Sequence, residues 1–359
     1  MPLTLLKKLH LHPALALMLL FVPISLVAEM LHAPGIAVFV LAALAIIPLA
    51  GVMGKATEEL AVHAGPTVGG LLNATLGNMA ELIIAVIAIR EGLFDVVKAS
   101  LTGSIVGNIL LVLGLSMLVG GCRHKSQEFN PKAAGMNSLM LVLACIGLLL
   151  PALVEHTVTD FVLEEISLIV AGVLILVYAA GLVFSFVTHS HLFSPGGRSG
   201  EAEEEPGMGV RLAVGMLIVA TVFMALESEA LVGSVEAAAH ALGMRDLFIG
   251  VVVVAIIGNA AEHSSAITMA LKNKMELSFG IAINSSTQVA LFAAPALVFI
   301  SLAMGNPMNL VFTQMEILAV ILSVLVVYMA SLDGRCDWFE GFQLLAVYIV
   351  MAVVFYFIP

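Results

Sequence analysis

Charged side chains are scarce in this sequence, at 11% of 359 residues, whereas a soluble globular domain has about 25%. Hydrophobic residue types make up 61% of the chain, and its mean hydropathy is +1.12. These values exclude an ordinary soluble domain. The composition therefore predicts an all-α polytopic membrane protein whose helices contact the lipid bilayer.

Other features are too few or absent, which argues against several functions. The three cysteines, Cys122, Cys145 and Cys336, are odd in number and scattered, so they indicate neither a disulfide framework nor a metal site. The net charge of −11 comes without a basic patch, so no nucleic-acid partner is indicated. The sequence also has no nucleotide-binding motif of the Walker type, so a primary pump is not indicated. We expect neither an enzyme nor a cofactor-binding protein.

Eleven apolar segments are suited to crossing a bilayer, which takes about 20 residues. They are residues 13–30, 34–54, 66–89, 94–119, 134–154, 161–187, 210–232, 247–271, 277–304, 308–332 and 338–358. A stretch rich in Gly, Pro, Ser and Glu separates the sixth from the seventh. We therefore expect an accessory N-terminal helix at 1–33, a five-helix repeat at 34–187, an acidic linker at 188–209 and a second five-helix repeat at 210–359.

The positive residues favour one orientation of these spans. With eleven spans and a cytoplasmic N-terminus, eleven of the fourteen Lys and Arg residues fall on the cytoplasmic side, together with the acidic linker. The odd number of spans then places the two halves in inverted orientations. The short N-terminus favours a prokaryotic plasma membrane, and a vacuolar-type membrane stays open as the alternative.

One short motif occurs twice. GNMAE at residues 77–81 returns 181 positions later as GNAAE at residues 258–262. Each copy places an Asn and a Glu three residues apart on one helix face, inside a long apolar segment. An ionisable residue in such a segment is a functional-site hypothesis by default, and the nearby glycines would permit a helix break. The duplication suggests a transporter built from internal repeats.

Further polar residues repeat after the motif. Ser104 and Asn108 are four residues apart, as are Asn284 and Gln288, 180 positions later. A deletion of one residue in the intervening loop would account for the change from 181 to 180. These residues are candidates for ligands of an ion, and packing between helices is the alternative.

Acidic residues also repeat before the motif. Glu58 in TEEL matches Glu229 in SEAL. We expect these two carboxylates either to line an ion pathway or to face water at the membrane interface. Their neighbours Glu59 and Glu227 are expected to be solvated.

The candidate site contains mainly hard oxygen donors, which suit calcium with its 6–8 oxygen ligands and do not suit zinc or copper. The predicted ligands are Glu81, Glu262, Asn78, Asn259, Ser104, Asn108, Asn284, Ser285, Ser286 and Gln288. For Asn78 and Asn259, hydrogen bonding between helices is the alternative.

The two carboxylates also suggest a coupling mechanism. In a low-dielectric site their charge must be compensated either by a divalent cation or by protonation. These two forms of compensation exclude one another. A site that reorients only when it is loaded with calcium or protonated would be an antiporter, with Glu81 and Glu262 carrying the protons.

These residues carry a family resemblance. GNMAELIIAVIAI and GNAAEHSSAITMAL resemble the two repeats of the calcium/proton exchangers, a branch of the calcium:cation antiporter superfamily. GSIVGNILLVLG, NSSTQVALF and the acidic EAEEE segment are also similar to that family. The resemblance implies eleven transmembrane helices, a central acidic linker, and calcium bound near Glu81 and Glu262. His263 matches the proton-coupled branch; it would relay protons or only hydrogen-bond a carbonyl.

Three other functions stay open at this point. A sodium-coupled or broad divalent cation exchanger is the nearest alternative, and proton dependence without sodium would separate it. A passive cation channel would need no counter-ion gradient. An intramembrane hydrolase would leave the duplication unexplained. The proportion of protons to calcium and the oligomeric state, including a homo-oligomer, also stay open.

Overall fold

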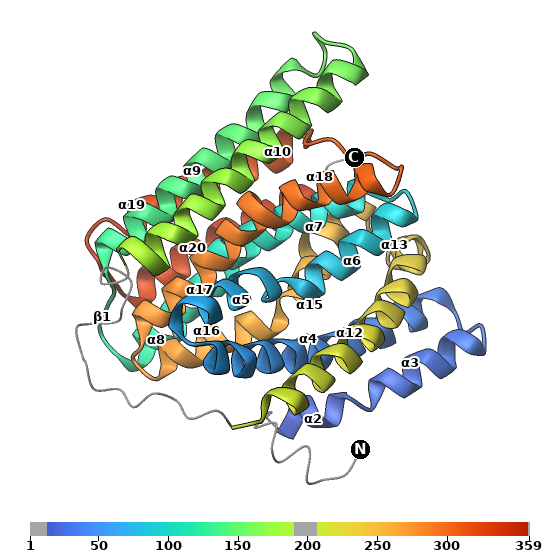
Figure 1. Cartoon of the computed structure of the whole chain (residues 1–359), viewed down its shortest axis with the longest axis horizontal. Helices are drawn as coiled ribbons and strands as arrows, with labels where there is room; N and C mark the ends of the chain where they lie inside the picture. Colours follow the sequence, from blue (N-terminus) through green and yellow to red (C-terminus); the bar gives the residue numbers. More distant parts are fainter. Residues whose placement is uncertain (1–12, 190–206, 358–359) are drawn as a thin grey trace.

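A computed structural model describes residues 13–189 and 207–357, which are almost entirely helical (Figure 1). The first half contains α2 (Pro13–Met18), α3 (Phe21–Met30), α4 (Gly35–Ala64), α5 (Pro66–Leu76), α6 (Met79–Arg90), α7 (Phe94–Val106), the π-helical η1 (Gly107–Val112), α8 (Leu113–Arg123), β1 (Gln127–Glu128), α9 (Pro131–Val154), α10 (Asp160–Val183) and the π-helical η2 (Phe184–Thr188).

The second half contains α12 (Val210–Gly233), α13 (Val235–Leu242), α14 (Asp246–Phe248), the π-helical η4 (Ile249–Val254), α15 (Ala255–Gly258), α16 (Ala260–Leu271), α17 (Met275–Gln288), the π-helical η5 (Val289–Ala293), α18 (Ala294–Ala303), α19 (Gln314–Ala330), β2 (Arg335–Cys336) and α20 (Trp338–Phe357). β1 and β2 form one antiparallel pair. The predicted linker lies largely outside the described residues, as do residues 1–12.

The described residues contain eight helices that are long and apolar enough to cross a membrane, or nine if the bent pair Ile249–Gly258 and Ala260–Leu271 counts as one span. The prediction of an all-α polytopic membrane protein is confirmed at this level. Two shorter apolar helices, Leu15–Met30 and Gln314–Ala330, correspond to the other two predicted segments.

Both copies of the repeated motif coincide with a break in a helix. Gly77 and Asn78 separate α5 from α6, and Asn259 separates α15 from α16. The backbone angles match: Asn78 has φ −94° and ψ 23°, and Asn259 has φ −94° and ψ 7°. At the second break the chain bends by 66°. The breaks place Glu81 and Glu262 in the first turns of α6 and α16.

The spacing between the two halves stays at 181 residues beyond the motif. α7 and α17 begin 181 positions apart. Gly92 and Asn273, which adopt positive φ angles of 77° and 59° in the preceding loops, are also 181 apart. The two loops therefore have equal length, and the predicted change to 180 is wrong. Ser104 consequently corresponds to Ser285.

The segment before the first break also differs from the prediction. The predicted spans at 34–54 and 66–89 leave residues 55–65 as a connection, but α4 continues through most of this segment to Ala64. This segment, KATEELAVHA, consists mostly of good helix formers. The helix ends at Gly65, whose φ of 80° suits a residue without a side chain.

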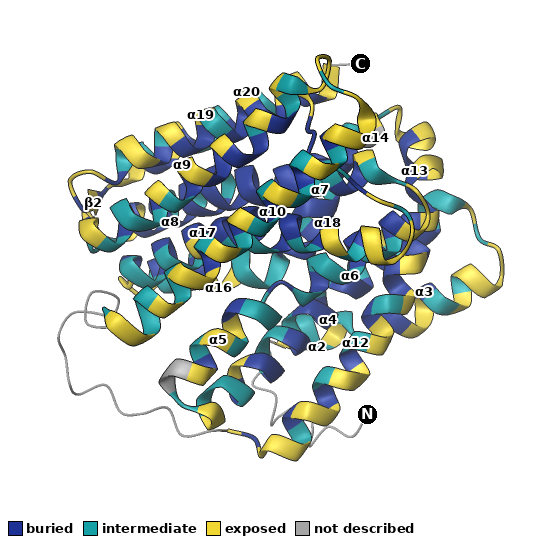
Figure 2. Cartoon of the chain, turned by 45° about the horizontal axis from the view of Figure 1, so that its top comes forward, coloured by how far each residue is buried: buried dark blue, intermediate teal, exposed yellow. Residues whose placement is uncertain are grey.

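The broken helices lie in the middle of the bundle. α4 packs along α12, α6 packs on α12, and α16 packs on α17 and α8 (Figure 1). α10 packs on α18, and α9 packs on α19 and α17. Figure 2 shows buried residues gathered in the interior and exposed residues along the outer helices. Large exposed apolar side chains such as Leu139 on α9 and Ile169 on α10 are suited to contact with lipid.

Each half caps a helix end in the other half. The Gln127 side-chain amide donates to the carbonyl of Ala270 at 2.9 Å, near the end of α16. The Asn306 amide donates to the carbonyl of Ile89 at 2.8 Å, near the end of α6. Ile89 and Ala270 are 181 positions apart. Each of these carbonyls also accepts a backbone N–H from the loop that follows, from Gly92 and Asn273, so each side-chain cap is a second donor at a helix end.

The halves also approach each other closely at Gly103 of α7. A side-chain carbon there would collide with the backbone carbonyl of Val251 in η4. Gly107 is a neighbouring buried glycine on the same helical segment, and a carbon added there would meet nothing within 4 Å.

We expect Gly103→Ala to destabilise the protein by about 1–3 kcal/mol, because the two backbones would have to separate. Gly107→Ala should be neutral or slightly stabilising, because alanine reduces the conformational entropy of the unfolded chain. Thermal unfolding of both variants in detergent checks this. Equal stability of the two variants would contradict the close approach.

Candidate ion-binding site

A cavity of about 810 Å³ reaches into the middle of the bundle from one end. Helices α4, α5, α9, α10, α16 and α17 all contribute to its walls. The predicted site residues that line it are Glu58, Glu81, Glu262, Asn284, Ser285 and Gln288.

Glu81 and Glu262 face each other across the two breaks, near enough to interact electrostatically. Gly258 of the second break lies directly beside Glu81: a carbon added there would make ordinary contacts, 3.4 Å from Cγ and 3.8 Å from Oε1 of Glu81. Within the described residues, neither carboxylate forms an ion pair with a basic side chain. The N-terminal ends of α6 and α16 supply only partial positive charge. Full compensation of two carboxylates therefore requires a mobile cation or protons.

The Asn259 side chain is fully engaged in hydrogen bonds. Its Nδ2 donates to Ser104 Oγ and to the carbonyl of Ala255, both at 2.9 Å. Its Oδ1 accepts from Nδ2 of Asn108 at 3.2 Å. Asn108 also donates to Ser285 Oγ at 2.9 Å. This network joins α7, α17 and the second break.

The Asn78 side chain is only half engaged. Its Nδ2 donates to Gln288 Oε1 at 3.1 Å, but its buried Oδ1 has no hydrogen-bond partner. Oε2 of Glu262 is also buried without a partner. Glu262 lines the cavity, and Asn78 lies behind the cavity-lining Gln288 to which it bonds. Buried acceptors are nearly always paired in proteins, so these two unpaired oxygens need an explanation. A bound cation would supply it.

Three other predicted site residues are placed differently. Asn284 lies at the cavity wall, where its Oδ1 accepts from Asn137 at 2.8 Å. The Ser286 hydroxyl donates to carbonyls of α17 and α7, at 3.0 and 3.3 Å, so it is engaged with the backbone. His263 follows Glu262 on α16 but does not line the cavity.

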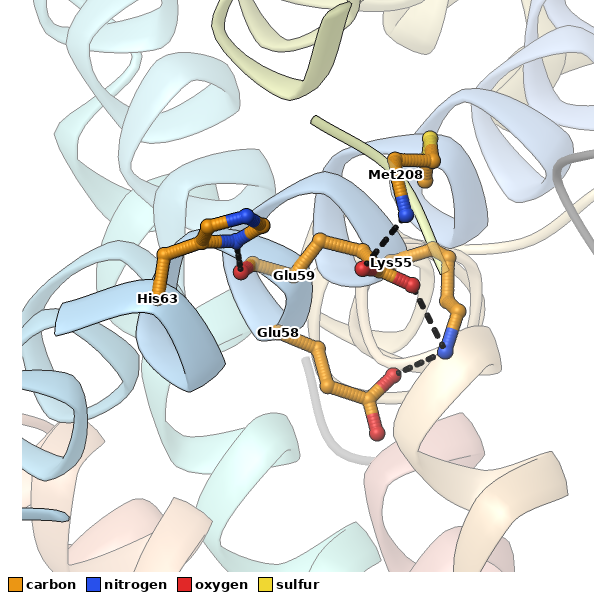
Figure 3. A network of polar contacts seen from close by, with 5 residues as sticks. All are labelled: Lys55, Glu58, Glu59, His63 and Met208. Atoms are coloured by element: carbon orange, nitrogen blue, oxygen red, sulfur yellow. Dashed lines mark hydrogen bonds and ion pairs between the residues drawn. The ribbon is translucent and has the colours of Figure 1, made fainter. Parts of the chain in front are cut away.

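Glu58 lies in a polar network on α4 at the cavity wall (Figure 3). Lys55 Nζ is 2.8 Å from Oε2 of Glu58 and 3.7 Å from Oε1 of Glu59. Oε2 of Glu59 accepts from the backbone N–H of Met208 at 3.1 Å, and His63 Nδ1 is 2.8 Å from the Glu59 carbonyl oxygen. Glu59 thereby holds the described C-terminal end of the predicted linker against α4.

The counterpart residues on α12 lie elsewhere. Glu229 is exposed, 3.3 Å from Arg90, and does not line the cavity. The prediction that Glu59 and Glu227 are solvated is wrong, since they are 5% and 0% exposed. Glu227 is covered because α12 packs against α3 and α4.

The sequence reasoning missed several polar residues that line the cavity, among them Asn137 and Tyr178. Asn137 bonds to Asn284, and the Tyr178 hydroxyl bonds to the carbonyl of Ala74 at 3.0 Å. Each lies in a strongly apolar segment with few other polar side chains. An isolated polar residue in such a segment is the signal that could have found them.

The chemistry of the site is that of a hard-cation site formed by the protein's own oxygens. Among the described residues, no group of three or more His, Cys, Asp or Glu side chains is placed to hold a metal ion. Two carboxylates and neighbouring amide and hydroxyl oxygens, open to solvent through one cavity, can admit a cation and release it. Broken helices with acidic residues at their ends, enclosed by apolar spans, define the class of secondary ion transporters.

Comparison with known proteins identifies the family. The chain belongs to the sodium/calcium exchanger protein family, whose sequence model matches residues 34–187 and 212–357. It is 47% identical over 357 residues to the Ca(2+)/H(+) antiporter of Aphanothece halophytica, covering 95% of this chain and 96% of that one. It is 44% identical to the Ca(2+)/H(+) antiporter ChaA of Bacillus subtilis, covering 93% and 96%.

Solved structures agree with this assignment. Native YfkE superposes with a TM-score of 0.84 at 40% identity, covering 96% of this chain and 100% of that one. The H+/Ca2+ exchanger CAX superposes with a TM-score of 0.73, covering 95% and 91%, but at 15% identity it supports the fold alone.

We expect Asn108→Leu to destabilise the protein by about 1–3 kcal/mol, because Oδ1 of Asn259 would lose its donor in a buried network. Ser116→Ala is the control, since the Ser116 hydroxyl is buried without a hydrogen-bond partner and its removal should cost much less. Thermal unfolding in detergent without calcium checks both. If the two variants unfold alike, the network does not hold the break in place.

Proposed function

We propose that this protein exchanges calcium for protons across a membrane, by alternating access at the site between α6 and α16. The observation that carries the proposal is the facing pair Glu81 and Glu262, which share one cavity and have no basic partner among the described residues. The relatives named above as Ca(2+)/H(+) antiporters match over nearly their whole lengths.

Calcium is the cation that suits this site. Glu81 and Glu262 would bind it directly, and the unpaired oxygens of Asn78 and Glu262 are acceptors that a cation would satisfy. Ser285 and Gln288 at the cavity wall are further oxygen donors. We assign Asn259, Ser104 and Asn108 to holding the second break, since the amide and carbonyl groups of Asn259 are already used.

Protons serve as the counter-ion because they compensate the same charge. Calcium must displace protons from Glu81 and Glu262 to bind, and the protonated site must lose calcium. The doubly charged empty site would be too costly to bury during reorientation, which prevents a leak of calcium. His263 is not needed for this exchange, because both carboxylates can take protons from the cavity directly.

The repeats supply the alternating access. We propose eleven spans: an accessory helix within 1–33, inverted repeats at 34–187 and 210–359, and a cytoplasmic linker at 188–209. The two matched segments of the family, the breaks 181 positions apart and the reciprocal caps at Ile89 and Ala270 support this division. The N-terminus would be cytoplasmic, in a prokaryotic plasma membrane. The cavity would open to the cytoplasm, because it reaches Lys55 and Glu58 on the side of Met208.

We expect Glu81→Gln and Glu262→Gln each to reduce calcium uptake driven by a pH gradient by about 100-fold or more, because each removes a charged ligand and a proton acceptor. Uptake into proteoliposomes without sodium measures this. Glu128→Gln is a suitable control, because Glu128 is an exposed carboxylate on β1, paired with Arg335 at 3.1 Å. Uptake that ignores the pH gradient would favour a channel, and uptake that requires sodium would favour a sodium-coupled exchanger.

The dependence on pH has a definite sign. Acidification on the side from which calcium binds should raise the calcium concentration needed for half-maximal transport, because protons occupy the carboxylates that calcium requires. The maximal rate at saturating calcium should change less. Initial rates at several pH values on that side, with the other side held constant, test this. A half-saturating concentration that does not change with pH would contradict competition at one site.

A further inference from the structure

Two carbonyls at matched positions have different hydrogen-bond donors. Ala74 and Ala255 are 181 positions apart, and each precedes the asparagine of its break by four residues. In the second half, the carbonyl of Ala255 accepts from the Asn259 side chain at 2.9 Å. In the first half, the carbonyl of Ala74 accepts from the Tyr178 hydroxyl at 3.0 Å.

This difference coincides with the different states of the two asparagines. Asn259 folds back onto its own helix, and its oxygen is used by Asn108. Asn78 instead reaches across to Gln288, and its oxygen is left without a partner. A carbonyl has two lone pairs, and the Ala255 carbonyl already accepts from both the backbone N–H and the side chain of Asn259. The first half differs, because the backbone N–H of Asn78 does not bond to the Ala74 carbonyl in the described structure and the Tyr178 hydroxyl does. The hydroxyl therefore competes for the carbonyl onto which the Asn78 amide would fold back, as Asn259 does in the second half.

Tyr178 is held firmly enough to do this. It is only 5% exposed, and its ring stacks on Phe292 of η5 with ring centroids 5.5 Å apart. Nearby, Gly70 of α5 admits the ring of Phe186 from η2, and any larger residue there would collide with that ring. α5 is thus fixed against α10 and η2 by both contacts, with the hydroxyl of Tyr178 at its last turn.

We propose that Tyr178 is a positioning residue that keeps Asn78 turned toward Gln288 and so presents the Asn78 oxygen to the transported cation. Tyr178 itself does not bind the ion. It makes the two half-sites unequal, with a ligand in the first asparagine and a helix-holding group in the second. The proposal rests on the proposed function, because it assigns Asn78 to the calcium site of that exchange.

The test is Tyr178→Phe, which removes the hydroxyl and keeps the ring on Phe292. The Asn78 amide should then fold back onto the Ala74 carbonyl, as Asn259 does on Ala255. We expect the calcium concentration for half-maximal transport to rise about 3- to 10-fold, the range for loss of one hydrogen bond, with little change in maximal rate. Tyr348→Phe is the matched control, because the Tyr348 hydroxyl is buried on α20 without a partner.

A double-mutant cycle separates positioning from general support of the fold. Gln288→Leu removes the acceptor of the Asn78 amide, so adding Tyr178→Phe should weaken calcium binding by clearly less than it does in the wild-type background. Calcium-dependent thermal stabilisation of the purified protein measures binding even in variants that transport poorly. It also shows, in the absence of calcium, whether each variant is folded.

Three outcomes would overturn the proposal. In the first, Tyr178→Phe changes calcium affinity no more than Tyr348→Phe does. In the second, Tyr178→Phe lowers the maximal rate or the stability without calcium, but leaves calcium affinity unchanged. In the third, Tyr178→Phe weakens calcium binding as much in the Gln288→Leu background as in the wild type. Failure of the proposed function would look different, because the wild-type protein itself would then bind no calcium or would not exchange it for protons.

Discussion

Two carboxylates that face each other inside a membrane protein, without a fixed positive partner among residues 13–189 and 207–357, are the constraint on which this structure depends. Each would be costly to bury alone, and their mutual repulsion adds to the cost. In place of a basic side chain, the chain supplies partial charges from two helix ends and a cavity open to solvent. A lysine or arginine here would neutralise the site permanently. Its absence leaves the compensation to ions that can come and go.

The breaks in the two helices follow from the same requirement. A continuous helix would pair the backbone through this region and leave no helix end near Glu81 or Glu262. Asn78 and Asn259 interrupt the helices with nearly equal backbone angles, but their side chains are held differently. Backbone symmetry between the halves therefore does not impose chemical symmetry. The structure combines one asparagine that holds the break with one whose oxygen is free.

Much of the site could be predicted from the sequence, because the duplicated motif is short, polar and embedded in apolar segments. The pairing of Glu81 with Glu262, the breaks at the asparagines and the all-helical class follow from that pattern. The register beyond the motif could not be inferred from residue chemistry. Ser104 and Asn108 are similar in type and spacing to Asn284 and Gln288, but the two pairs do not occupy corresponding positions in the repeats. The equal lengths of the loops at Gly92 and Asn273 decide the register. The burial of Glu227 could not be predicted, because it depends on the packing of α12 against α3, which is a tertiary contact. The role of Tyr178 also depends on tertiary structure, since Ala74 lies 104 residues away in the chain.

The central claim is that calcium and protons compete for the same two carboxylates. Counting the protons released when calcium binds tests this most directly. Calorimetric titrations of the purified protein in buffers of different ionisation enthalpy give this number. At a pH where the calcium-free site is protonated, the account predicts about two protons released per calcium by the wild type, and about one by Glu81→Gln or Glu262→Gln if binding survives. Calcium binding that releases no protons at any pH would contradict the account.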